Sequence, residues 1–138
     1  MLIPWLVLLK LNWRQFKMIT IEEILRGQPN YPPEYKDNLM DLYKKINIVR
    51  SSYGKPMIVT SGYRSVAWEK KQGRSGKSDH CKCMAVDIYD PKKEIAAWCY
   101  EHQELLRSIP LWVEDPSYTS NWVHFTTKPK SQLFFIPY

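Results

Sequence analysis

Apolar residues recur three or four positions apart in two long stretches of the chain, which is the spacing of one helix face. The first stretch, residues 32–54, predicts an amphipathic helix that ends at a glycine. The second, residues 91–109, predicts another helix with Pro91 at its start, where the missing N–H of proline has no helical partner to lose. Shorter helical segments are predicted in 20–27 and at the beginning of 66–80.

Between and after these helices, short runs rich in β-branched and aromatic residues predict strands. The two longest late strands flank the turn PSYTS and are typical of a hairpin. Helices and strands interleave, but the late joins are of the hairpin type, so we expect an α+β fold with a mostly antiparallel sheet flanked by helices. The predicted strands are 57–61, 83–90, 111–116, 121–127 and 133–138.

Charge narrows the possible partners. The formal net charge is +6 over 138 residues, and the pI is about 9.2. A net positive charge of this size favours an anionic partner: nucleic acid, a membrane surface, or a carboxylate-rich polymer such as a bacterial cell wall. The lysines and arginines are scattered, with no run longer than two, and we therefore expect no nucleic-acid partner.

The first seventeen residues differ from the rest of the chain. Their apolar run, 2–9, is about half the length needed to span a bilayer, so no transmembrane span is expected. No basic segment precedes the run and no small-residue cleavage site follows it, which argues against a signal peptide. We predict a hydrophobic extension at 1–17 that offers a possible protein partner site, and one domain at 18–138. Cytoplasmic production, with release at lysis or packaging in a virion, is the favoured localisation.

Three cysteines, Cys81, Cys83 and Cys99, make an odd set. The first two are too close for an easy intramolecular disulfide and too close for a zinc knuckle. Reduced thiols are therefore expected.

The segment SDHCKCMAVDIYD raises a chemical question, because Asp87 lies inside an otherwise apolar strand. A buried charge is costly unless it is paired, and the partner can be an arginine such as Arg64, a hydrogen-bond network or a metal. His80 stands seven residues earlier, and His124 stands in the later strand NWVHF. Two imidazoles and one carboxylate are the protein ligands of many catalytic zinc sites, which leave a fourth position for water.

Three ordered motifs carry a family resemblance: SGYRS at 61–65, SDHCKCMAVD at 78–87 and WVH at 122–124. Together they resemble the zinc D-alanyl-D-alanine peptidases, in particular their short phage-borne and bacterial members. The resemblance covers about 19–127 and implies a hedgehog/DD-peptidase-like fold. It also implies a zinc metallopeptidase that hydrolyses an amide bond in peptidoglycan stem peptides, as a D,D-carboxypeptidase or as an endopeptidase of the endolysin type.

The resemblance also implies roles for single residues. His80, Asp87 and His124 would bind Zn²⁺. Arg64 would hold a substrate carbonyl or carboxylate, or the developing oxyanion, as a fixed cation can. The other residues implied in substrate binding are Ser78, Tyr63 and Trp122.

Two departures from the family pattern stand out. The usual glycine between the first histidine and the aspartate is Cys83, which either packs as a thiol or faces the site. The usual acidic general base, three residues before the last histidine, is Asn121, which cannot accept a proton. The nearest carboxylates are Glu114 and then Asp115, which a hairpin would return towards His124. If neither serves, the chain is a non-catalytic zinc-binding relative, such as a phage virion or other structural component.

Overall fold

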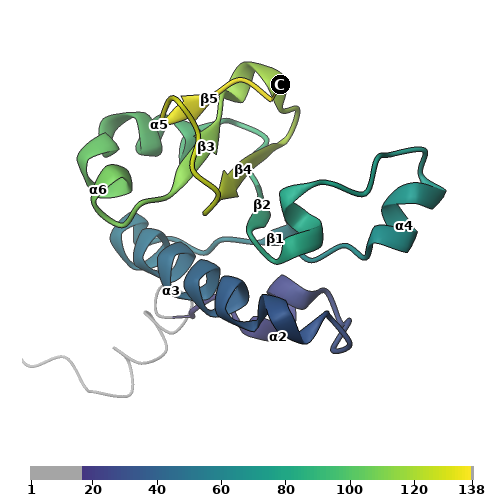
Figure 1. Cartoon of the computed structure of the whole chain (residues 1–138). Helices are drawn as coiled ribbons and strands as arrows, with labels where there is room; N and C mark the ends of the chain where they lie inside the picture. Colours follow the sequence, from purple (N-terminus) through teal and green to yellow (C-terminus); the bar gives the residue numbers. More distant parts are fainter. Residues whose placement is uncertain (1–16, 138) are drawn as a thin grey trace, which may run out of the picture.

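The structure is a computed structural model and describes residues 17–137 (Figure 1). The predicted extension at 1–17 lies outside these residues except for Lys17. The helices are α2 (Ile21–Leu25), α3 (Lys36–Tyr53), α4 (Val66–Lys71), α5 (Glu94–Glu101) and α6 (Gln103–Ser108). The 3-10 helices are η1 (Pro33–Tyr35), η2 (Asp79–Lys82) and η3 (Pro116–Tyr118). The strands are β1 (Val59–Ser61), β2 (Ala85–Tyr89), β3 (Trp112–Glu114), β4 (Trp122–Thr126) and β5 (Phe134–Phe135).

The five strands form one sheet in the order β1-β2-β4-β3-β5. Neighbours pair antiparallel from β1 through β3, and β5 pairs parallel with β3. The predicted α+β class with a mostly antiparallel sheet is confirmed. The parallel join of β5 needs a return loop across the end of the sheet, which the short sequence pattern of that strand does not indicate.

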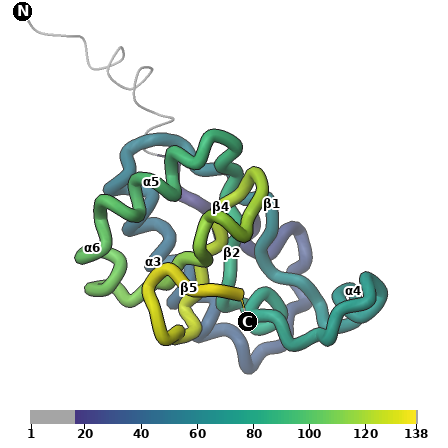
Figure 2. The backbone as a smooth tube through the Cα atoms, turned by 90° about the horizontal axis from the view of Figure 1, so that it is seen from above, coloured from purple at the N-terminus to yellow at the C-terminus, as the bar shows by residue number. Residues whose placement is uncertain are grey.

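Helix α3 packs along one face of the sheet and forms the core with it (Figures 1 and 2). Its apolar positions are those predicted from the helical spacing, and Leu42, Ile46 and Val49 have no exposed surface. They meet the strand residues that point to the same face, such as Val86 and Phe125. Burial of this face stabilises both elements, because each apolar side chain removed from water contributes roughly 1.5–3 kcal/mol.

The single helix predicted at 91–109 is wrong. Helix α5 begins at Glu94 and α6 begins at Gln103, with His102 between them at φ −123 and ψ 39. Pro91 stands in a turn before α5. Lys93 adopts the left-handed conformation there, and Asp90 binds the first free N–H groups of the helix. The apolar spacing continues through the break, so the periodicity alone does not reveal it.

Within 17–137, no helix is both long enough and apolar enough to cross a bilayer.

Candidate metal centre

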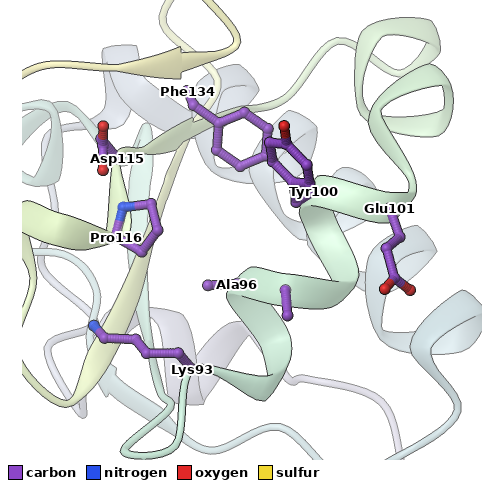
Figure 3. A pocket seen from close by; sticks show the side chains of 8 residues that line it. Lys93, Ala96, Tyr100, Glu101, Asp115, Pro116 and Phe134 are labelled. Carbon is purple, nitrogen blue, oxygen red and sulfur yellow. The ribbon is translucent and has the colours of Figure 1, made fainter.

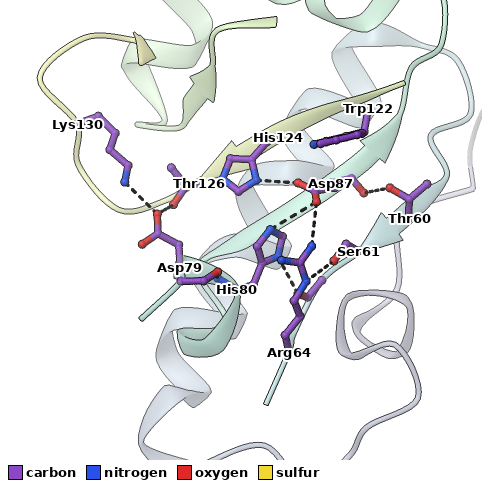
Figure 4. Close-up of polar contacts among 12 residues, drawn as sticks. Thr60, Ser61, Arg64, Asp79, His80, Asp87, Trp122, His124, Thr126 and Lys130 are labelled. Carbon is purple, nitrogen blue, oxygen red and sulfur yellow. Dashed lines mark hydrogen bonds and ion pairs between the residues drawn. The ribbon is translucent and has the colours of Figure 1, made fainter. Parts of the chain in front are cut away.

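Two imidazoles and a carboxylate face one another on one side of the sheet (Figure 4). Asp87 lies in the middle of β2 and stands opposite His124 of β4, so both side chains leave the same face. His80 comes from η2, just before β2. The Nδ1 of His124 lies 2.7 Å from Oδ1 of Asp87, and the Nε2 of His80 lies 3.5 Å from Oδ2. One donor atom from each residue lies within 4.8 Å of the others.

Ser78 and Gly62 fix the orientation of His80. The Oγ of Ser78 accepts a hydrogen bond from the backbone N–H of His80 at 3.0 Å and caps η2. The Nδ1 of His80 lies 2.8 Å from the carbonyl oxygen of Gly62, which can only accept, so Nδ1 carries the proton. Nε2 is therefore left with its lone pair beside Asp87, as a metal-binding histidine requires.

Neighbouring groups keep Asp87 ionised although only 6% of the residue is exposed. Burial alone would raise the pKa of this carboxyl. The hydrogen bond from His124 and the adjacent His80 imidazole outweigh the burial and hold the pKa well below its usual range. The guanidinium of Arg64 adds a positive charge, with Nη2 at 3.5 Å from Oδ2.

This set of donors fits a zinc ion. Catalytic zinc sites commonly use three protein ligands, two of them imidazoles, and keep one position open. Here two imidazole nitrogens and one carboxylate converge, and the carbonyl of Gly62 selects the right tautomer of His80. The His80–Asp87–His124 group is therefore positioned to bind a metal.

Arg64 is fixed at the edge of this group. Its backbone N–H donates to the carbonyl of His80 at 3.2 Å, which joins the segment after β1 to η2. Its Nε donates to the Oγ of Ser61 at 2.9 Å. The two terminal nitrogens face different carboxylates, Asp87 on the metal side and Glu69 on the other.

The hairpin of β3 and β4 brings Glu114 to the metal centre. Val113 pairs with Phe125, and Glu114 and His124 are the next residues along the two antiparallel strands. Both side chains line the same hollow. Partial burial raises the pKa of Glu114 above its ordinary value, and the nearby Asp87 adds to this, while His124 opposes it.

Asp115 and Asn121 lie elsewhere. The Oδ1 of Asp115 accepts hydrogen bonds from the N–H and Oγ of Ser117, and these bonds lower its pKa. Asp115 lines a separate hollow beside α5, with Phe134 (Figure 3). Asn121 precedes β4 and is exposed, and its carbonyl accepts from the N–H of Asp90 at 2.8 Å.

The three cysteines are buried free thiols, as the sequence predicts. Cys83 adopts φ 57, so the turn keeps the left-handed conformation that favours glycine. Its side chain has no exposed surface and belongs to the core, and burial raises its pKa to about 11. Cys83 is therefore a packed thiol. Burial, with a hydrogen bond to Glu69, raises the pKa of Cys81 to about 12.

Three further residues carry an implied substrate role. Ser78 lines the hollow beside His124 as well as capping η2. Trp122 is half-buried at the start of β4, on the same face as His124. Tyr63 is only 6% exposed, and its ring meets the edge of Tyr31 in the core.

One polar residue near the site was missed in the sequence. Glu69 stands in α4 beside two lysines, a pattern typical of a solvated helix surface, yet it is only 1% exposed. No feature of the sequence distinguishes it from a surface glutamate.

Comparison with known proteins gave one match. A family model described as Peptidase M15 matches residues 17–109. This range contains Arg64, His80 and Asp87, and the structure adds His124 from beyond it. No match was found among curated proteins or among solved structures. Because the family model covers more than half of the chain, the chain belongs to the peptidase M15 family of zinc-dependent peptidases.

Proposed function

We propose that this protein is a zinc metallopeptidase that hydrolyses an amide bond in peptidoglycan stem peptides. The observation that carries the proposal is the His80–Asp87–His124 group with two further functional side chains beside it, Glu114 and Arg64. If no base and no cation stood next to the metal site, the site would support metal binding but not hydrolysis.

His80, Asp87 and His124 would hold the zinc ion. When bound, zinc supplies Lewis acidity and brings the pKa of a water molecule towards neutrality. The hydrogen bond from His80 to Gly62 keeps Nε2 available for this role, and the low pKa of Asp87 keeps its carboxylate ionised across the neutral range.

Glu114 is the proposed general base. Its carboxylate would take a proton from the attacking water and later pass it to the amine that leaves. A raised pKa suits this exchange, because a base works best when its pKa approaches the working pH. Glu114 thereby takes the place of the family's usual acid, which is Asn121 in this chain.

Arg64 is the proposed electrophilic partner of the substrate carbonyl. Its guanidinium is fixed before the substrate arrives, by Ser61 on one side and by two carboxylates on the others. A cation held in place in this way stabilises the charge that develops on the carbonyl oxygen without reorganising.

The charge around the hollow supports an anionic substrate. Lys77, Lys128 and Lys130 line the same hollow as His124 and Glu114, and Asp79 there faces Lys128 and Lys130 at 3.9 and 3.1 Å, which leaves Lys77 without an ion pair among the contacts of the described residues. Stem peptides carry free carboxylates, and positive charge beside a cleft raises the local concentration of such a substrate. Release at lysis or packaging in a virion, and a partner site in 1–17, stay predictions of the sequence.

The test is digestion of purified peptidoglycan with and without a chelator, followed by mass spectrometry of the released fragments. We expect new amine and carboxyl ends in the stem peptide, loss of cleavage with chelator, and recovery with zinc. Glu114→Gln should lower the rate by about 10²–10⁴-fold while zinc stays bound, because general-base catalysis contributes about that much.

Asp115→Asn is the matched control, because Asp115 caps η3 and lines a different hollow. Its rate should equal that of the unmodified protein. If zinc binds at one ion per chain and no peptidoglycan preparation is cut, the proposal fails and the non-catalytic alternative stands.

A further inference from the structure

Glu69 is a buried carboxylate close to the metal centre but outside the set of its ligands. It lies in α4 and is 1% exposed. An isolated ionised carboxylate in such a place is costly, so its charge has to be matched by nearby donors.

Three side chains meet the carboxylate of Glu69. The Sγ–H of Cys81 donates to Oε1 at 3.1 Å, and Cys81 is itself 2% exposed. The Nη1 of Arg64 lies 3.4 Å from Oε2, and the Nη1 of Arg74 lies 3.7 Å from the same oxygen. The side chain of Arg74 is half exposed, whereas that of Arg64 is 22% exposed.

The contacts of Arg64 explain what Glu69 does there. Figure 4 shows its guanidinium between Ser61 and Asp87. Nε donates to Ser61 at 2.9 Å, Nη2 faces Asp87 at 3.5 Å, and Nη1 faces Glu69. Each nitrogen therefore has its own partner, and the plane of the guanidinium is fixed.

We propose that Glu69 is a positioning residue that holds Arg64 beside the metal centre and offsets its charge. Two carboxylates face the guanidinium of Arg64, Glu69 and Asp87. If Glu69 lost its negative charge, Asp87 would remain as the carboxylate partner. Asp87 is also the carboxylate of the metal group, so Arg64 would compete with the metal for it. Glu69 keeps that competition weak while leaving Nη2 directed at the site.

The proposal has two consequences, of which one rests on the proposed function. Neutralising Glu69 should weaken zinc binding, because an uncompensated cation beside a metal site opposes the ion. It should also slow peptide hydrolysis through kcat rather than KM, if Arg64 stabilises charge that develops during the reaction. Outer partners of metal sites typically change metal affinity or activity by about 10–100-fold.

The experiment uses Glu69→Gln, which keeps the shape of the side chain and removes its charge. Zinc affinity is measured by competition with a chromophoric chelator, and turnover is measured on a soluble stem-peptide fragment. We expect zinc affinity to fall about 10–100-fold and kcat to fall over a similar range. In the Arg64→Ala background, Glu69→Gln should change neither quantity further, because the residue acts through Arg64.

Arg74→Ala is the matched control. It removes the other cation that faces Glu69 and should leave zinc affinity and kcat within about twofold of the unmodified protein, because Arg74 is half exposed and an ion pair screened by water contributes little. Equal losses for Glu69→Gln with and without Arg64 would overturn the proposal and make Glu69 a structural charge partner only.

If Glu69→Gln does not fold, Glu69→Asp decides. Glu69→Asp keeps the negative charge, so zinc affinity should be unchanged. It withdraws the carboxylate from Arg64 by one methylene group, so kcat should fall. This fall should be absent in the Arg64→Ala background. An unchanged kcat would overturn the proposal. Should the unmodified protein cut no peptide, the proposed function fails, and the zinc affinities of Glu69→Gln with and without Arg64 still decide the role of Glu69.

Discussion

Gly62 joins the fold to the metal centre through its lack of a side chain. A Cβ at this position would overlap the carbonyl oxygen of Ile24, which is backbone and accepts the N–H of Tyr63 at 2.7 Å. The carbonyl of Gly62 in turn accepts the Nδ1 proton of His80. We expect Gly62→Ala to lower the free energy of unfolding by about 1–3 kcal/mol, as overpacking does, and to weaken zinc binding.

Gly73→Ala is the control for this prediction, because Gly73 has φ +78 and an added Cβ meets no atom. It should cost about 1 kcal/mol for the left-handed backbone and leave zinc affinity unchanged. Urea unfolding and a chelator titration on both variants give the two quantities. Equal zinc affinities for the two variants would show that Gly62 does not orient His80.

Single residues also show how far the sequence predicts the candidate site. Three residues of types suited to zinc, in ordered motifs, are enough to nominate His80, Asp87 and His124, and the structure brings all three together. Glu69 is different, because its burial depends on how α4 packs against Cys81 and not on any local pattern. Glu114 was predicted in part. The turn after β3 suggests that Glu114 approaches His124, but only the pairing register of β3 with β4 fixes its position.

At the scale of elements, Asp90 determines how α5 leaves the sheet. It directly follows β2 and is 3% exposed, and its two oxygens accept the N–H groups of Ile95 and Ala96 at 3.0 Å each. We expect Asp90→Ala to lower the free energy of unfolding by about 2 kcal/mol, because two buried N–H groups at the start of a helix lose their acceptor. Zinc affinity should hold.

Chemical denaturation measures this loss, and Asp115→Ala is the comparison. Asp115 also caps a helix, but η3 is short and its cap is exposed, so the loss should be smaller. A larger loss for Asp115→Ala than for Asp90→Ala would contradict the assigned role of Asp90.

Elements were predicted well where the pattern is local and poorly where it is not. The apolar spacing of α3 is local, and so is the short helical pattern at 20–27, and helices α3 and α2 lie within these predicted segments. The backbone break at His102 interrupts no apolar spacing, and the parallel pairing of β5 joins segments far apart in the chain, so periodicity encodes neither.

At the scale of the whole molecule, the metal centre joins parts of the chain that fold from different regions. His80 and Asp87 belong to the segment matched by the family model, and His124 comes from the hairpin beyond it. A ligand that binds only the native arrangement stabilises it by mass action. At a free zinc concentration of one hundred times Kd, the gain should be about 2.7 kcal/mol in the free energy of unfolding.

His124→Ala should remove most of this gain, because it leaves two of the three donors. His102→Ala is the matched control, since His102 lies at the junction of α5 and α6, stacked on Trp98 and away from the metal centre. It should keep the full dependence on zinc, whatever it costs in absolute stability. Urea unfolding with and without zinc gives the increment for each variant. If His124→Ala retained the increment of the unmodified protein, His124 would not be a zinc ligand.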